Sequence, residues 1–223
     1  MEDAELVFQR TLANKARNYP GAADSRSSGG KIFPSFAPGF EIPKGSSVFT
    51  IGSCFARNVE RALLGRDIVV PTADYSAPSD EAPGQPNRIL NQYNPATMLQ
   101  CVQAAGQDPS EVALYDAPGG KGVIDPLLAT GTRPVSRARA LERRAEISAL
   151  YRDGLAASDT VVITLGLIEA WFEAQSGHYL NEAPMRRVLK DHPGRWTFHR
   201  MSVETCRGMV QALVEAVRAP RQR

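Results

Sequence analysis

Residue types suited to acyl chemistry stand at two places in the sequence, each just after a short apolar run. Gly52 and Ser53 follow residues 47–51, and Gly166 follows residues 160–165. If both runs are parallel strands, their carboxyl ends lie at one edge of a sheet, where α/β proteins bind ligands. Ser53 would then stand before the first turn of a helix, whose free N–H groups and dipole favour an oxyanion. A serine placed in this way can act as a nucleophile with an oxyanion donor beside it.

The same residues also have simpler explanations. Taken alone, Ser53 is more often a plain helix N-cap, because serine is a preferred capping residue. Gly52 allows a tight turn in either case. Cys54 follows at the helix start, where the pKa of a thiol can fall, but a small buried side chain is the more common role. We therefore expect Cys54 to pack into the helix interface.

The elements that must position Ser53 follow from the apolar periodicity. Residues 47–51 are β-branched and apolar, as in a buried strand, and residues 67–70 can form a second strand. The unbroken apolar run 160–165 predicts a central strand that is parallel to 47–51 and fully buried. A helix over residues 54–64 places three apolar side chains on one face: Phe55, Val59 and Leu63. This order of elements predicts an α/β fold with a parallel sheet.

The rest of the chain gives clear helix signals and long loops. Asn94 and Pro95 predict a helix start, with the asparagine as N-cap and the proline at the first helical position. Residues 136–157 predict a long helix, and residues 202–218 an amphipathic one. Proline-rich residues 71–93 predict a surface loop. We also expect the region between Trp171 and Ser202 to be a loop.

A family resemblance rests on three ordered blocks. Residues 52–56 read Gly-Ser-Cys-Phe-Ala, the five letters that name the GSCFA family, and the resemblance continues in residues 93–97 and 162–171. Such proteins are similar to SGNH/GDSL hydrolases, which implies a three-layer α/β sandwich with a mainly parallel sheet. The resemblance makes Ser53 the nucleophile and Asn94 an oxyanion donor. It also implies oxyanion or substrate contacts from neighbouring residues: Gly52, Cys54, Gly166 and Glu169.

One position in the third block departs from the pattern of the resembling hydrolases. Those hydrolases place an asparagine two residues after the glycine, and this chain has Ile168 there. A further oxyanion donor must then be a backbone N–H or Asn94. Glu169 would repel an oxyanion; it could orient a partner or bind a substrate hydroxyl, and a structural hydrogen bond is equally compatible with the sequence.

The general base is the larger departure. The resemblance implies a histidine after the last strand of the sheet, on a segment that follows helix 202–218. The chain ends at Arg223, so we expect a domain truncated at its C-terminus and a weak hydrolase or none. His178, His192 and His199 are the histidines present. Of these, His199 is the favoured base, because it lies in a short extended piece in which it could be half-buried.

Composition excludes several classes of protein. The chain has 223 residues, a formal net charge of +2 and 43% hydrophobic residues, so neither nucleic acid nor a membrane is an expected partner. The three cysteines have no metal-ligand spacing, which favours reduced thiols in a cytoplasmic protein. We expect an N-terminal arm over residues 1–45 and one domain over residues 46–223.

The resemblance implies ester hydrolysis or acyl transfer through an acyl-serine at Ser53. O-acylated carbohydrate is the favoured substrate class, and neither a metal nor an organic cofactor is implied. The alternative is a non-catalytic GSCFA-domain protein that binds an anionic or carbohydrate group at the helix N-terminus.

Overall fold

The structure is a computed structural model that describes residues 3–14, 23–25, 27–28, 31–32, 37–82, 84–131 and 133–219. The chain divides into two compact units, Met1–Glu41 and Ile42–Arg223. The first unit contains helix α1 (Ala4–Ala13), which Asp3 caps, and an antiparallel pair of short strands, β1 (Ser27–Ser28) and β2 (Lys31–Ile32). Within the described ranges, no helix is both long and apolar enough to cross a membrane.

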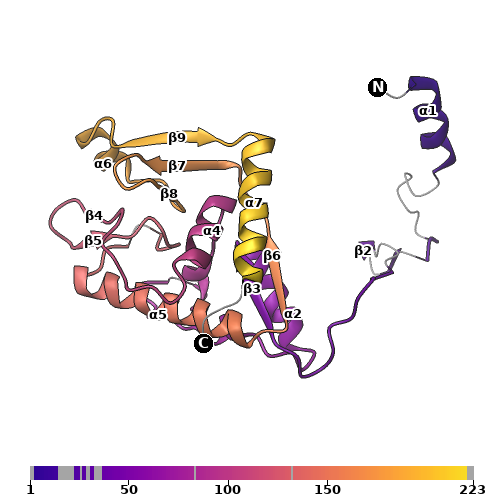
Figure 1. Cartoon of the computed structure of the whole chain (residues 1–223), viewed down its shortest axis with the longest axis horizontal. Coiled ribbons are helices and arrows are strands. Elements are labelled where there is room, and N and C mark those ends of the chain that lie inside the picture. The colour runs from indigo at the N-terminus through magenta and orange to yellow at the C-terminus, as the bar shows by residue number, and fades with distance from the viewer. Residues whose placement is uncertain are drawn as a thin grey trace. The chain divides into compact units, whose positions relative to one another are not determined.

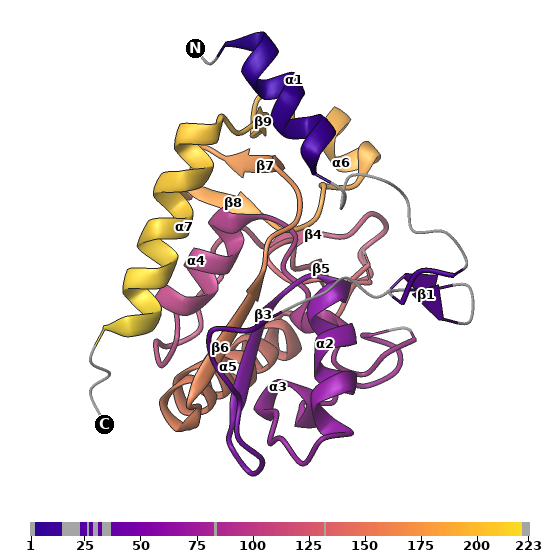
Figure 2. The same cartoon turned by 90° about the vertical axis from the view of Figure 1, so that its right-hand side faces the viewer.

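A parallel pair of strands forms the centre of the second unit (Figure 2). Strand β3 (Val48–Gly52) pairs with β6 (Thr160–Thr164) in a register that sets Gly52 opposite Thr164. Val69 extends the pairing on the other side of β3 through a parallel bridge to Ser47. The predicted α/β class and the parallel pairing are therefore confirmed.

Helices cover β3 on both faces. Phe49 and Ile51 pack in one cluster with Met98, Tyr151 and Leu213, which come from three different helices. The opposite face carries Val48, which packs against Ile68 and Val70, and Thr50, which hydrogen-bonds Glu60 of helix α2 (Cys54–Leu64). The two faces of β3 thus differ: one is wholly apolar and the other includes buried polar groups.

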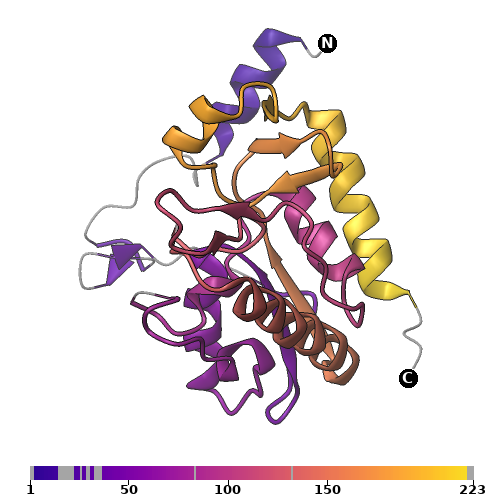
Figure 3. The ribbon, with the colours of Figure 1, turned by 90° about the vertical axis from the view of Figure 1, so that its left-hand side faces the viewer.

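Four of the helices that the structure describes in the second unit agree with the sequence prediction, and the two short ones, at residues 71–74 and 186–191, lie in segments that were predicted to be loops. The α-helices are α2 (Cys54–Leu64), α3 (Pro71–Asp74), α4 (Pro95–Gln103), α5 (Arg137–Ala157), α6 (Arg186–Asp191) and α7 (Val203–Arg218). Ser53, Asn94, Ser136 and Ser202 each cap a helix through the side-chain oxygen. Figure 3 shows α7 (yellow) beside α4 (magenta). The predicted loop over residues 71–93 contains α3 and a 3-10 helix, η2 (Arg88–Leu90).

Three expectations need correction. Strand β6 is half-buried along its whole length rather than fully buried, because only β3 is paired with it. The region between Trp171 and Ser202 is not a loop: it folds into an antiparallel sheet of β7 (Glu169–Glu173), β8 (His178–Leu180) and β9 (Trp196–Arg200), in the order β8-β7-β9 (Figure 1). The sheets are not mainly parallel, since β4 (Tyr115–Asp116) and β5 (Val123–Ile124) also pair in antiparallel fashion.

Candidate functional site

Ser53 stands between the end of β3 and the start of α2, as the sequence predicts. It is the N-cap of α2, and its Oγ accepts a hydrogen bond from the backbone N–H of Phe55 at 3.4 Å. The residue is only 6% exposed. Since the first turn of a helix has N–H groups without intrahelical acceptors, the hydroxyl lies where a negative oxygen is stabilised.

Gly52 is required by its contact with the neighbouring strand. Its φ is +147°, and a Cβ at this position would overlap Thr164 Oγ1 and lie 2.6 Å from the Thr164 carbonyl oxygen. Any other residue would push β3 away from β6. The turn that carries Ser53 is therefore fixed by the close approach of the two parallel strands.

Hydrogen bonds join the first block to the residue that precedes the second block, and the second block to the third. The N–H of Gln92 donates to the carbonyl of Gly52 at 2.9 Å, and the N–H of Leu167 donates to the carbonyl of Tyr93 at 2.6 Å. A Cβ on Gly166 would lie 2.7 Å from the same Tyr93 oxygen. Segments that are distant in sequence thus meet near Ser53. Their contacts are backbone hydrogen bonds and a close approach that only glycine allows.

Asn94 belongs to this junction, but its side chain is bound on two sides. Its Oδ1 accepts from the N–H of Thr97 at 3.0 Å, and its Nδ2 donates to the carbonyl of Leu180 at 3.2 Å. Asn94 is 1% exposed. It therefore caps α4 and ties that helix to β8, and only one N–H of its amide remains for any other acceptor.

Polar atoms that sequence reasoning missed also surround the junction. Thr164 Oγ1, Asn91 Oδ1 and Gln92 Oε1 are buried, and none has a hydrogen-bond partner within the described ranges. Unpaired buried acceptors are rare in native proteins and call for a specific explanation. No signal in the sequence separates these residues from ordinary loop and strand positions, because burial depends on the folded packing.

A buried ion pair lies on α2 itself. Arg57 Nη2 is 3.0 Å from Glu60 Oε1, and both side chains are 2% exposed. Thr50, Thr72 and Asn87 each donate to the Glu60 carboxylate. Burial lowers the pKa of Arg57, although Glu60 opposes that shift. The network fastens the first turns of α2 to β3 and α3 through charged groups.

The network adds charged residues to the buried side of α2, while Val59 and Leu63 of the predicted apolar face are half-buried and Phe55 is not. The sequence placed Phe55 on its apolar face, yet Phe55 is 66% exposed, and the residues that α2 buries are Ala56, Arg57 and Glu60. Cys54 was expected to pack into the interface and is exposed instead. Both residues, the two that follow the Ser53 cap in the first turn of α2, are therefore open to solvent.

The histidines hydrogen-bond elsewhere. His199 Nε2 pairs with Thr197 Oγ1 at 2.9 Å and its Nδ1 with the Tyr179 hydroxyl at 3.3 Å, while its ring stacks on Phe172. His178 Nδ1 lies 2.7 Å from the carbonyl of Ser176, and His192 meets the ring of Trp196 edge-on. Across the described ranges, no histidine hydrogen-bonds Ser53 Oγ. Glu169 lies on β7 beside Arg200, at 3.8 Å, and is partly exposed.

An apolar groove lies beside the third block. It has a volume of about 370 Å³ and is lined by residues that include Leu165, Ile168, Val203 and Val210. Leu165 is 57% exposed and Ile168 39%. Exposed apolar surface of this kind, next to a strand end, is a common feature of binding sites.

These observations define an α/β domain whose candidate site is a serine-bearing turn between a parallel strand and a helix. The family model of the GSCFA family matches residues 47–223, so the chain belongs to the GSCFA family. Neither a search of curated proteins nor a search of solved structures returns a match. No group of three His, Cys, Asp or Glu side chains is placed to hold a metal ion in the described part of the chain.

Proposed function

We propose that this chain has a serine-based acyl-transfer site at Ser53, which acts slowly as an esterase or acyltransferase. The observation that carries the proposal is the junction itself: Gly52, Gln92, Tyr93 and Gly166 hold the three family blocks around one serine at a helix N-terminus. Preorganised N–H groups at such a position stabilise the oxyanion that forms when a serine attacks an ester.

The proposed substrate is an O-acylated molecule, with an acylated carbohydrate as the favoured class. The resemblance to SGNH/GDSL hydrolases supports this class of reaction, and the apolar groove beside Leu165 and Ile168 supports an acyl group as the part recognised. An acyl chain gains free energy from such a groove in proportion to the apolar area that it buries. No step of the proposed reaction needs a metal or an organic cofactor.

Slow turnover follows from the environment of the hydroxyl. Ser53 Oγ accepts a hydrogen bond from Phe55 N, and no described histidine is bonded to it to remove its proton. A general base typically contributes on the order of 10²–10⁴-fold to such reactions. We therefore propose a rate lower by about that factor than that of a serine esterase with its base in place.

A second candidate function is binding without catalysis. The specific observation in its favour is the bonding of the histidines to Thr197, Tyr179 and Ser176 rather than to Ser53. The turn would then bind an anionic or carbohydrate group at the N-terminus of α2, and Ser53 would act only as the helix cap.

Hydrolysis of p-nitrophenyl acetate tests the proposal. Because the exposed thiol of Cys54 can also react with an activated ester, the assay compares the native chain with Ser53→Ala and with Cys54→Ser. We expect slow turnover that Ser53→Ala abolishes and Cys54→Ser leaves intact. Turnover that survives Ser53→Ala, or that Cys54→Ser alone removes, would contradict a serine nucleophile.

A further inference from the structure

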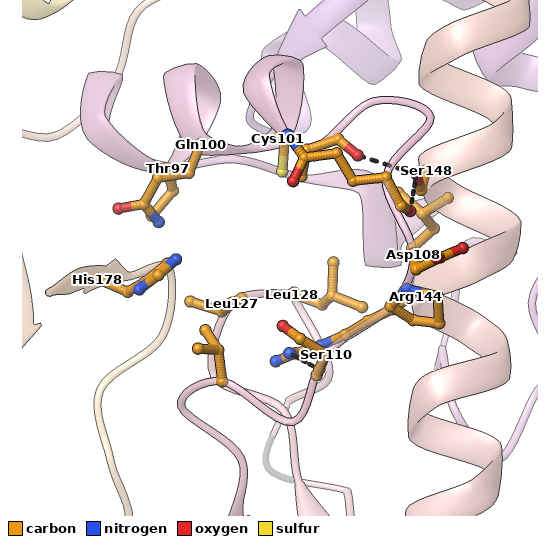
Figure 4. Close-up of a pocket in the computed structure, with 15 residues that line it drawn as sticks. Thr97, Gln100, Cys101, Asp108, Ser110, Leu127, Leu128, Arg144, Ser148 and His178 are labelled. Carbon is orange, nitrogen blue, oxygen red and sulfur yellow. Dashed lines mark hydrogen bonds between the residues drawn. The ribbon is translucent and has the colours of Figure 1, made fainter. Parts of the chain in front are cut away.

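A separate cavity, with no lining residue from the Ser53 turn, lies between α4, α5 and β8; Figure 4 shows residues that line it. Its volume is about 170 Å³. Apolar side chains form much of the wall, among them Leu127, Leu128 and Ile147, and the thiol of Cys101 points into the space (Figure 4). A cavity of about 150 Å³ with a similar aliphatic lining is known to hold benzene, so this one has room for a single ring.

The buried charged groups at the cavity are already paired, whereas Asp108, which also lines it, is exposed to solvent. Arg144 donates to both oxygens of Asp125, at 2.8 and 2.7 Å, and also to the carbonyl of Ser110 at 2.6 Å. Asp125 is fully buried. Burial raises the pKa of the Cys101 thiol to about 12, so the thiol is neutral at physiological pH. The deep part of the cavity therefore favours an uncharged ligand.

His178 supplies a free acceptor at one end of the cavity. Its Nδ1 lies 2.7 Å from the carbonyl of Ser176. Because a carbonyl only accepts, Nδ1 of the neutral ring holds the hydrogen, and Nε2 presents a lone pair. The ring projects toward the cavity (Figure 4), and Nε2 makes no hydrogen bond within the part of the chain that the structure describes.

The position of His178 is fixed by the neighbouring helix. The side chain of Gln100 on α4 makes two hydrogen bonds to the backbone of Tyr179, the residue next to His178 on β8. Gln100 Oε1 accepts from the N–H of Tyr179 at 2.8 Å, and Gln100 Nε2 donates to the carbonyl of Tyr179 at 2.9 Å. The acceptor and the apolar wall thus belong to elements that are bonded to each other. A preformed cavity with one aimed polar group is the usual form of a small-molecule site.

We propose that this cavity binds an uncharged, single-ring alcohol or phenol. The ring packs against Leu127, Leu128 and Ile147, and the hydroxyl donates to Nε2 of His178. The proposal is independent of the acyl chemistry at Ser53, because the two sites share no residue.

Calorimetric titration with p-cresol and with toluene tests the proposal. The two probes have nearly the same shape, and only p-cresol has a hydroxyl. One hydrogen bond of ordinary strength corresponds to roughly tenfold tighter binding of p-cresol. His178→Phe is expected to remove that difference and to leave toluene binding unchanged. His192→Phe, at a histidine outside the cavity, is the matched control and should behave as the native chain.

Filling the cavity gives an independent test. Ala104 lines the cavity at the exposed C-terminal end of α4, so Ala104→Phe should abolish the binding of both probes. Cys101→Met is a second filling variant in case the first does not fold, and circular dichroism reports folding for each. The proposal is overturned if p-cresol does not bind at millimolar concentration, if the filling variants that remain folded still bind it, or if His178→Phe keeps the preference for p-cresol.

Discussion

At the scale of single residues, the candidate site depends on close backbone contacts more than on side chains. Gly52 touches Thr164 across the parallel pair, and its carbonyl accepts from Gln92. Gly166 meets the carbonyl of Tyr93 in the same manner. These contacts hold the Ser53 turn in place whether or not any substrate is bound.

Gly52→Ala is expected to lower the free energy of unfolding by about 3 kcal/mol, because the added Cβ combines a positive φ with a clash against β6. Urea denaturation measures the change. Gly65→Ala is the control: its φ is −71°, and a Cβ there would be 3.9 Å from the nearest atoms. We expect the control to be neutral or slightly stabilising. Equal effects of the two substitutions would show that the contact with Thr164 does not fix the turn.

Asn94→Ala should cost about 1–2 kcal/mol of unfolding free energy, since it removes the cap of α4 and leaves the carbonyl of Leu180 without its donor. Asn94→Asp keeps the cap oxygen but sets a buried carboxylate oxygen against the carbonyl of Leu180, so its loss should be larger than that of Asn94→Ala. Thermal denaturation of both variants measures this order. If Asn94 serves only as an oxyanion donor, stability will be unchanged while the reactivity of Ser53 falls.

The residue types at the turn were predictable from the sequence, but their surroundings were not. A serine after a strand and before a helix is a local pattern, and the GSCFA letters reinforce it. The unpaired oxygens of Thr164, Asn91 and Gln92 depend on which atoms the fold buries. Local patterns contain no information about that burial.

At the scale of elements, α2 shows how a helix can be predicted correctly and oriented only in part, since Val59 and Leu63 are half-buried as expected and Phe55 is exposed. Apolar periodicity placed Phe55 inside, whereas the structure buries Arg57 and Glu60. Charged side chains are almost never fully buried unless they are paired, and their partners, Thr50, Thr72 and Asn87, lie in other segments. Capping residues predict the ends of a helix to within a few residues. A buried ion pair cannot be predicted in this way, because its partners lie in segments that are distant in the sequence.

Substitutions on the two faces of α2 measure which one is buried. Glu60→Gln leaves Arg57 as an uncompensated buried charge and should lower the free energy of unfolding by about 3–5 kcal/mol. Phe55→Ser changes an exposed residue and should stay within about 0.5 kcal/mol of the native value. Chemical denaturation compares them. A larger loss in Phe55→Ser than in Glu60→Gln would contradict the orientation of α2.

The sheet of β7, β8 and β9 was missed for a related reason. Each strand is short, and their pairing joins residues up to 31 positions apart, as between Glu169 and Arg200. The apolar residues Trp171, Phe172 and Phe198 give no helix or strand period on their own. Cross-strand pairs supply the stabilisation, and they exist only after the chain has folded back.

At the scale of the whole molecule, the α/β class followed from the order of strong local signals. The strands at 48–52 and 160–164 were recognised because both are continuous apolar runs beside helices. Full burial of β6 was predicted from that same apolarity and is wrong, since its exposure depends on how many strands the sheet contains.

The stability of the whole molecule should fall in alkaline solution. Burial raises the pKa of Cys101 to about 12, and it also raises the pKa values of Tyr115 and Tyr151. In the unfolded chain these groups lose protons from about pH 8.5 for the thiol and about pH 10 for the phenols. Above those values the unfolded state binds fewer protons than the folded one, so the free energy of unfolding decreases as pH rises.

Denaturation midpoints between pH 7 and pH 11 test this dependence. Cys101→Val has no ionisable group, so its stability should decline less between pH 8.5 and pH 10 than that of the native chain. A stability that is constant or rises over this range would contradict the inferred burial of these groups.

The central claim is that Ser53 forms a covalent acyl-type adduct, and labelling with a fluorophosphonate tests it most directly. Because no described base activates the hydroxyl, the account predicts slow modification, followed over hours by intact mass and located by peptide mapping. The adduct should lie on Ser53, be absent in Ser53→Ala, and persist in Cys54→Ser. No adduct on Ser53 after prolonged exposure, or modification of another residue at an equal rate in Ser53→Ala, would contradict the proposed site.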